Sequence, residues 1–235
     1  MSRNMFAYVV LAALTCVALT GCDGCEKYNG DNQEAVTVGR EDAECMVMIC
    51  VDLSGSFADR MADDGKAYEF TLRVTDTYFR NSVGTNNRIL IGQLSGTDRS
   101  LLWDGTPVEL RRDFPSAGKF RDFLLKRSNP GGSRIHDGIA EAFDYVLSDP
   151  GVAGGKTRTA MFVLSDMIDN LSDPKSEERL AGSLQAFGKT KGVAGFYFLE
   201  HGRVPTWRQH LRQSGIRNWV CESEIVAYPT LPTFE

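Results

Sequence analysis

Apart from Cys22-Asp23-Gly24-Cys25, the sequence contains no Cys-x-x-Cys pair, and its three histidines are scattered. A structural zinc site usually takes four such ligands at short spacing, so this pattern disfavours zinc. No Gly-x-Ser-x-Gly sequence occurs, and no serine and histidine are placed as a catalytic pair. The sequence therefore gives no support for a serine hydrolase.

Basic residues are also fewer than acidic ones. The 235 residues include 26 Lys and Arg against 31 Asp and Glu, which gives a formal net charge of −5. An acidic protein is repelled by nucleic acid and by anionic lipid, so the overall charge argues against both as partners.

One apolar stretch, Met5 to Leu19, is too short to span a bilayer comfortably and follows the positively charged Arg3. Small residues come after it, which is typical of a secretory signal peptide. From its last residue the chain continues as Leu19-Thr20-Gly21-Cys22. This segment resembles the lipobox of bacterial lipoproteins.

The resemblance implies cleavage before Cys22 and lipidation of its thiol and its amine, with palmitate as a typical acyl group. Several acyl chains hold a protein on a membrane almost permanently. Asp23 follows, and an aspartate there resembles the inner-membrane retention signal of enterobacterial lipoproteins. We therefore expect a protein anchored at the periplasmic face of the inner membrane. The alternative is an ordinary signal peptide followed by an incidental cysteine.

The predicted division of the chain has four parts. Residues 1–21 form the signal peptide, 22–43 the lipidated cysteine and a polar tether, 44–228 one domain, and 229–235 a C-terminal tail. Cleavage removes Arg3 and no acidic residue, so the net charge falls from −5 to −6. About 190 residues suffice for one domain with a sizeable core.

Four of the six cysteines remain after Cys16 is removed and Cys22 is lipidated: Cys25, Cys45, Cys50 and Cys221. In an oxidising compartment four thiols allow three complete pairings. Cys50 lies inside an apolar run, so a free buried thiol is an equally open interpretation.

Apolar runs alternate with helical patterns along the chain. Short runs rich in Val and Ile predict buried strands, and apolar residues spaced three and four apart predict helices. An Asp104-Gly105 turn between two apolar arms predicts a hairpin over 100–110. The predicted strands are 45–52, 88–94, 159–165, 193–199 and 218–227, and the predicted helices are 66–80, 117–127, 133–146, 176–187 and 206–213. We expect a three-layer α/β fold: a mostly parallel sheet, one antiparallel edge strand, and helices on both faces.

Hydroxyl and carboxylate side chains follow the predicted strands. Asp52 ends the predicted strand 45–52 and is followed by Ser54 and Ser56, and Asp166 comes at the end of the predicted strand 159–165. Ser133 follows two glycines and precedes a helix. Ligands bind α/β sheets at the carboxyl ends of the strands, and hard oxygen donors suit Mg²⁺ or Mn²⁺.

These segments, in this order, resemble the von Willebrand factor type A (VWA) domain and its metal-ion-dependent adhesion site (MIDAS). The pattern of that family is Asp-x-Ser-x-Ser, then a threonine after glycines, then an aspartate at the end of an apolar strand. The resemblance covers about residues 45–227. It implies a site for Mg²⁺, or for Mn²⁺ or Ca²⁺, held by the five residues Asp52, Ser54, Ser56, Ser133 and Asp166.

The same resemblance implies how the site works. The serines and the threonine equivalent contact the metal directly, and the aspartates act partly through water. The last coordination position is left for a carboxylate of a partner protein.

Two positions depart from the family pattern. Ser133 stands where threonine is usual; it keeps the hydroxyl but loses a methyl group that restricts the rotamer. Met167 stands where glycine commonly follows the aspartate, and we expect it to narrow the site or to offer an apolar contact to a partner.

The function that these features favour is a membrane-anchored, non-enzymatic module that binds an acidic residue of a partner protein through a divalent cation. A metal-dependent hydrolase is the alternative, and it needs a general base from Asp59, Asp63, Asp64 or His136. A third interpretation is a structural assembly protein with an unused site. No nucleic acid is expected as a partner.

Overall fold

A computed structural model describes residues 43–62, 65–79, 86–95, 100–128, 131–170 and 174–234, without the side chains of Phe79 and Pro174. All of them belong to one compact unit, Val38–Glu235. The predicted signal peptide, Cys22, Cys25 and all but the last residue of the predicted tether lie outside the described residues. None of the described helices is long and apolar enough to cross a membrane.

A six-stranded sheet has the order β3-β2-β1-β4-β5-β6, and only β3 runs antiparallel to its neighbour. This confirms the predicted fold class. The strands are β1 (Cys45–Val51), β2 (Asn87–Gln93), β3 (Leu101–Gly105), β4 (Arg158–Leu164), β5 (Val193–Leu199) and β6 (Asn218–Ser223).

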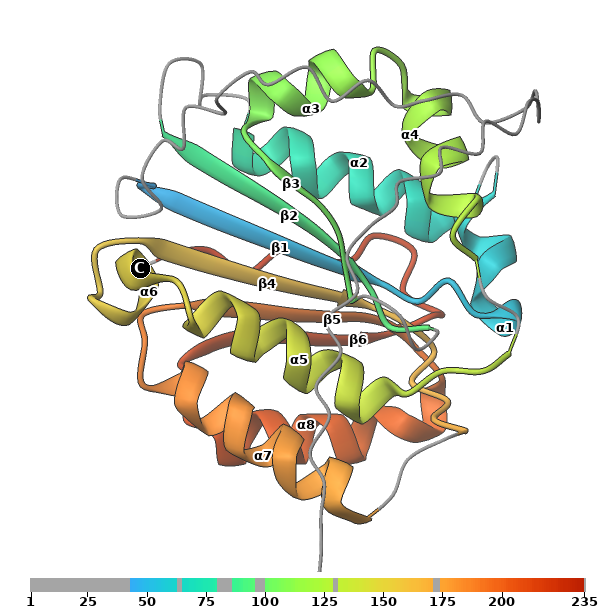
Figure 1. Cartoon of the computed structure of the whole chain (residues 1–235). Coiled ribbons are helices and arrows are strands. Elements are labelled where there is room, and N and C mark those ends of the chain that lie inside the picture. The colour runs from blue at the N-terminus through green and yellow to red at the C-terminus, as the bar shows by residue number, and fades with distance from the viewer. Residues whose placement is uncertain are drawn as a thin grey trace, which may run out of the picture. The chain divides into compact units, whose positions relative to one another are not determined.

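Helices cover both faces of the sheet (Figure 1). On one face lie α1 (Gly55–Ala58), α2 (Lys66–Phe79), α3 (Pro107–Asp113) and α4 (Ala117–Leu125); on the other lie α5 (Ile135–Leu147), α6 (Pro150–Ala153), α7 (Pro174–Gly188) and α8 (Val204–Ser214). Short 3₁₀ turns occupy Asp59–Met61 and His201–Arg203. The alternating side chains of β1 serve both layers: Met46, Met48 and Cys50 pack with α5 and α7, whereas Val47 and Ile49 pack with α2 and α4. Burial on both faces explains why these strands read as continuous apolar runs.

The predicted hairpin about Asp104-Gly105 is wrong. β3 pairs with β2, and the chain then begins α3 instead of returning as a second arm. Thr106 caps α3: its Oγ1 accepts from the Glu109 N–H at 3.2 Å, while Glu109 Oε2 accepts from the Thr106 N–H at 2.7 Å. With Pro107 in the first turn, this capping box outweighs the Asp-Gly turn signal.

Replacing Thr106 with alanine should lower the free energy of unfolding by about 1 kcal/mol, because the Glu109 N–H loses its acceptor, Thr106 Oγ1. Thermal or urea unfolding of residues 38–235 measures this. A loss of less than a few tenths of a kcal/mol would mean that the cap contributes little and that the packing of α3 alone sets its start.

Three cysteines in the described part of the chain are free thiols buried in the domain: Cys45, Cys50 and Cys221. Burial raises the pKa of Cys45 to about 11, of Cys50 to about 12 and of Cys221 to about 11. The neutral thiol is therefore the dominant form well above pH 8, and the thiolate is the reactive species.

We expect a thiol reagent at pH 8 to modify native residues 38–235 slowly and to titrate all three cysteines rapidly once the chain is unfolded in urea. Raising the pH toward 11 should accelerate the native reaction. Fast modification of the native domain at pH 8 would contradict the burial of these thiols.

The predicted tail packs onto the domain. The Tyr197 hydroxyl donates to the Thr230 carbonyl at 2.6 Å, Tyr78 donates to the Pro232 carbonyl, and Arg73 donates to the Pro229 carbonyl. Leu231 and Phe234 pack against the core layer that contains α2. Because its backbone carbonyls are held by side chains of α2 and β5, the segment 229–234 is an integral part of the structured domain.

Candidate metal centre

The site is built where two neighbouring strands end. β1 and β4 are adjacent and in register, with Val51 opposite Leu164. The Asp52 N–H continues this ladder by donating to the Leu164 carbonyl at 2.8 Å. Asp52 and the pair Ser165-Asp166 therefore leave the sheet side by side, at the carboxyl edge where open α/β sheets bind ligands.

Asp52 is fully buried and accepts three hydrogen bonds. Its Oδ1 accepts from the Ser54 N–H at 2.9 Å and from Ser133 Oγ at 3.1 Å. Its Oδ2 accepts from Ser165 Oγ at 2.8 Å. The bond from Ser54 two residues later is an Asx turn, which directs the chain into α1 and fixes the carboxylate.

Asp166 repeats this arrangement at the end of β4. Its Oδ1 accepts from the Ile168 N–H at 3.0 Å, and its Oδ2 accepts from Ser56 Oγ at 2.9 Å. The hydroxyls of Ser54 and Ser56 lie 3.3 Å apart. The structure thus brings all five sequence-predicted residues into one cluster.

Ser133 enters the cluster from the loop before α5. Its backbone forms an isolated β-bridge with Ser95 at the end of β2, and its carbonyl accepts from the Asn170 N–H at 3.3 Å. Gly132 adopts a φ of 109°, a region that glycine tolerates and that turns the chain toward Asp52. These contacts hold the Ser133 hydroxyl in place although the methyl group of a threonine is absent.

The two carboxylates have no cationic partner within the described ranges: neither Asp52 nor Asp166 forms an ion pair there. Burial raises the pKa of Asp52, and the charge of Asp166 acts in the same direction. Hydrogen bonds from Ser54 and Ser165 lower the same pKa and oppose the rise. Two buried acids without a counter-charge are costly, and a bound cation would offset that cost.

The oxygen spacing fits a small octahedral cation. Adjacent ligands of Mg²⁺, each 2.0–2.1 Å from the ion, lie about 3 Å apart. The three side-chain contacts within the cluster measure 2.9, 3.1 and 3.3 Å. These oxygens would need only small shifts to replace their mutual hydrogen bonds with contacts to an ion. The donor set, two carboxylates and three hydroxyls, is one that Mg²⁺ or Mn²⁺ accepts and zinc disfavours.

The cluster is open on one side. Asp52, Ser54, Ser133 and Asp166 are buried, whereas Ser56 and the preceding Gly55 are exposed. A group from outside can therefore approach the cluster past Ser56. No set of three or more His, Cys, Asp or Glu side chains in the described part of the chain is grouped to hold a metal, so the serine hydroxyls are essential to any site here.

Ser165 is a member of the cluster that sequence reasoning did not assign. Its hydroxyl donates to Asp52 Oδ2 and accepts from the Met167 N–H at 2.8 Å. It therefore orients Asp52 and shapes the turn after β4. A signal was present, because a polar residue directly before the aspartate interrupts an otherwise apolar strand.

Met167 does not offer an apolar contact to a partner, contrary to the expectation. It is 2% exposed and packs into the core layer of α5 and α7. Its φ of 62° lies in the left-handed region that favours glycine. The backbone thus keeps the conformation suited to glycine, and burial of the methionine side chain compensates for the strain.

The residues considered as a general base are placed as follows. The His136 backbone N–H donates to Asp169 Oδ2 at 3.0 Å, and the Nδ1 atom of His136 lies 3.4 Å from the same oxygen. The centroid of the His136 ring lies 5.7 Å from that of the Trp207 ring. Asp59 is exposed on the turn after α1, and Asp63 and Asp64 lie outside the described residues.

Comparison with solved structures identifies the fold. The VWA domain of SpRpn10 matches with a TM-score of 0.53 and 14% identity, over 80% of this chain and 92% of that chain. Proximal thread matrix protein 1 from the mussel byssus matches with a TM-score of 0.41 and 14% identity, over 78% of this chain and 45% of that one. The N-terminal domain of TFIIH p34 matches with a TM-score of 0.45 and 11% identity, over 77% and 92%.

The fold is therefore VWA-like, as the sequence predicted. No family model matches the sequence, and no curated protein matches it either.

Proposed function

We propose that this chain is a membrane-tethered protein-binding module that uses a divalent cation to engage an acidic residue of a partner protein. Asp52, Ser54, Ser56, Ser133 and Asp166 would hold the ion, and lipidated Cys22 would supply the tether. When bound, the cation would supply a Lewis-acidic position that a carboxylate can fill.

The observation that carries the proposal is the cluster of two buried carboxylates and three hydroxyls, gathered from three separate segments. It lies at the ligand-binding edge of the sheet, it has one exposed side, and its carboxylates form no ion pair within the described residues. A structural role alone would not require two uncompensated acids at this position.

The side chains around Asp52 are suited to positioning and not to proton transfer. Ser165 and the Ser54 N–H fix the orientation of the carboxylate, so its hydrogen-bonded oxygens are already directed before any ligand arrives. Such pre-orientation reduces the conformational entropy lost on binding. The His136 backbone N–H donates to Asp169, which is not a member of the cluster, and this placement favours a binding role over hydrolysis.

A crosslinking pull-down from membranes tests this proposal. The tethered protein should capture a partner in Mg²⁺ and lose it in chelator, and a soluble peptide or protein carboxylate should compete. Capture that is unchanged in chelator would contradict the proposal and favour assembly through other surfaces. Mn²⁺-dependent turnover of generic phosphoester or peptide substrates that disappears in an Asp52→Ala variant would favour the hydrolase instead.

A further inference from the structure

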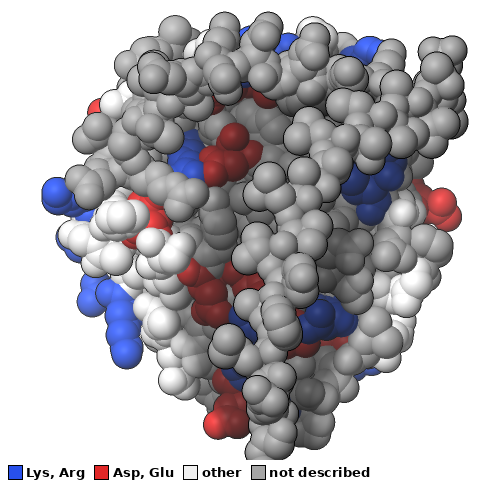
Figure 2. Space-filling view, in the orientation of Figure 1, with Lys and Arg blue, Asp and Glu red and all other residues white. Residues whose placement is uncertain are grey.

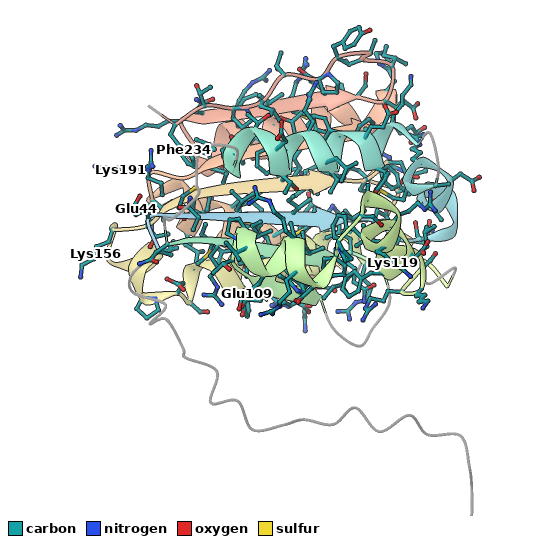
Figure 3. The ribbon with its side chains drawn as sticks, turned by 90° about the horizontal axis from the view of Figure 1, so that it is seen from above. Glu44, Glu109, Lys119, Lys156, Lys191 and Phe234 are labelled. Carbon is teal, nitrogen blue, oxygen red and sulfur yellow. The ribbon has the colours of Figure 1, made fainter. Side chains whose placement is uncertain are left out.

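The end of the domain opposite the candidate metal centre has a different character. The parallel strands begin there, and Figure 3 places Glu44, Lys156 and Lys191 together at that end, with Lys119 at the other. Basic side chains project at the corresponding left margin of Figure 2, whereas acidic side chains gather over α5 in the middle of that view. Charge is therefore unevenly distributed over the molecule.

A cavity of about 500 Å³ opens at this end between the starts of β5 and β6. Three cations line it: Lys189, Lys191 and Arg217. All three are exposed, and none forms an ion pair with a residue in the described ranges. The rest of the lining comes from small or polar residues, including Thr190 and Asn218. The cavity thus holds a charge of +3 without a compensating acid in its wall.

Helix dipoles reduce this charge only in part. The cavity lies beside the C-terminal ends of α7, at Gly188, and α8, at Ser214. Each helix C-terminus contributes roughly −0.5 of an elementary charge. The two helix ends together offset about one of the three positive charges, so a net charge of about +2 is left at the cavity.

A second cavity, of about 550 Å³, has a mixed wall. Tyr78, Leu231 and Phe234 form its apolar part, and Glu44 and Arg158 place one charge of each sign in it. The two cavities meet where the Asn218 amide, from the wall of the cationic cavity, donates to the Thr233 carbonyl in the wall of the second one. A cationic cavity beside one with a partly apolar wall matches a molecule that carries both a phosphate and an apolar part.

The chain enters the domain at this same end. Glu44 directly precedes β1, and β1 runs from there toward Asp52 at the opposite edge. The tether proposed above would therefore join the domain at its cationic end and not at the candidate metal centre, and this step rests on the proposed function.

We propose that the cavity of Lys189, Lys191 and Arg217 binds the phosphate of an anionic phospholipid headgroup and so docks the strand-start end of the domain on the membrane surface. The overall negative charge, which by itself argues against anionic lipid, does not prevent this. Exposed charges farther away than about 8 Å are largely screened at physiological salt, so the local cations dominate at contact. The inference does not depend on metal binding at the opposite edge.

Vesicle flotation of residues 38–235 tests the proposal. This unit contains both core layers and omits the predicted anchor, so any binding comes from the folded surface. Binding is expected to vesicles of phosphatidylcholine with phosphatidylglycerol, to weaken as salt rises, and to be absent with phosphatidylcholine alone. A basic residue at an anionic surface contributes about fivefold in affinity.

The variant Lys189→Gln/Lys191→Gln/Arg217→Gln should thus bind on the order of a hundredfold more weakly. Lys119→Gln, at an exposed lysine of the opposite end, is the matched control and should bind like the wild type. All four positions are exposed, and unchanged thermal unfolding would verify that the variants fold.

Three results would overturn the proposal. The first is no binding to the anionic vesicles, and the second is equal binding by the triple variant and the wild type. The third is a wild-type domain that binds inorganic phosphate in calorimetry and is released from vesicles by it at low millimolar concentration. That last result would make the cavity a site for a soluble phosphate and not for a membrane.

Discussion

Replacing Asp52 with alanine is expected to abolish Mg²⁺ binding by residues 38–235. The carboxylate is a central acceptor of the cluster, taking hydrogen bonds from Ser54, Ser133 and Ser165. Its loss would remove one of two anionic donors and release the Ser133 hydroxyl from its position. Removal of outer partners of a metal ligand already reduces affinity about 10–100-fold, so loss of the ligand itself should exceed a hundredfold. Isothermal titration calorimetry measures the change.

Two further variants separate metal binding from folding. Asp59→Ala removes an exposed aspartate seven residues away and should leave Mg²⁺ affinity unchanged. Asp52→Asn keeps one acceptor oxygen and the shape of the side chain but removes its negative charge. This variant should therefore stay folded and still fail to bind Mg²⁺. Wild-type affinity in both Asp52 variants would show that the cation, if bound, lies elsewhere.

Ending the chain after Tyr228 is expected to destabilise the domain strongly. Leu231 and Phe234 would no longer cover the α2 layer, and the buried Tyr197 hydroxyl would lose its acceptor at Thr230. The apolar contacts of two large side chains contribute about 1.5–3 kcal/mol each when fully buried, and an unsatisfied buried hydroxyl costs about 1–3 kcal/mol. Because both side chains are only partly buried, we expect a total loss of about 3–5 kcal/mol in urea unfolding.

The matched control is Tyr228→Ala. Its side chain is 85% exposed, directly before the deleted segment, and its removal should change the free energy of unfolding by no more than about 0.5 kcal/mol. A truncated chain as stable as the wild type would mean that residues 229–234 do not contribute to the stability of the domain.

The sequence was most informative where burial dictates residue type. β1 and β4 are covered on both faces, so their continuous apolar runs and the polar residues at their ends could be read directly. The proximity of Asp52 to Asp166 could be predicted from these strands, because adjacent parallel strands end at the same edge of a sheet. Local competition between signals was harder to resolve: Asp104-Gly105 resembles a hairpin turn, but the Thr106 cap and the pairing of Asp104 with Arg88 decide the structure.

Contacts that depend on distant segments could not be predicted. The carbonyls of Pro229, Thr230 and Pro232 accept from Arg73, Tyr197 and Tyr78 respectively. Nothing in the composition of either segment indicates these contacts. Met167 was expected to narrow the site or to contact a partner, but its side chain packs into the core layer of α5 and α7. The cationic cavity likewise arises only when the ends of α7 and α8 are brought together.

Crystals of residues 38–235 grown with Mn²⁺ test the central claim most directly. Anomalous scattering locates the ion without reference to any function. We predict one strong anomalous peak among the carboxylate of Asp52, the hydroxyls of Ser54, Ser56 and Ser133, and the carboxylate of Asp166. A saturating Mn²⁺ concentration that leaves this position without a peak would contradict the account.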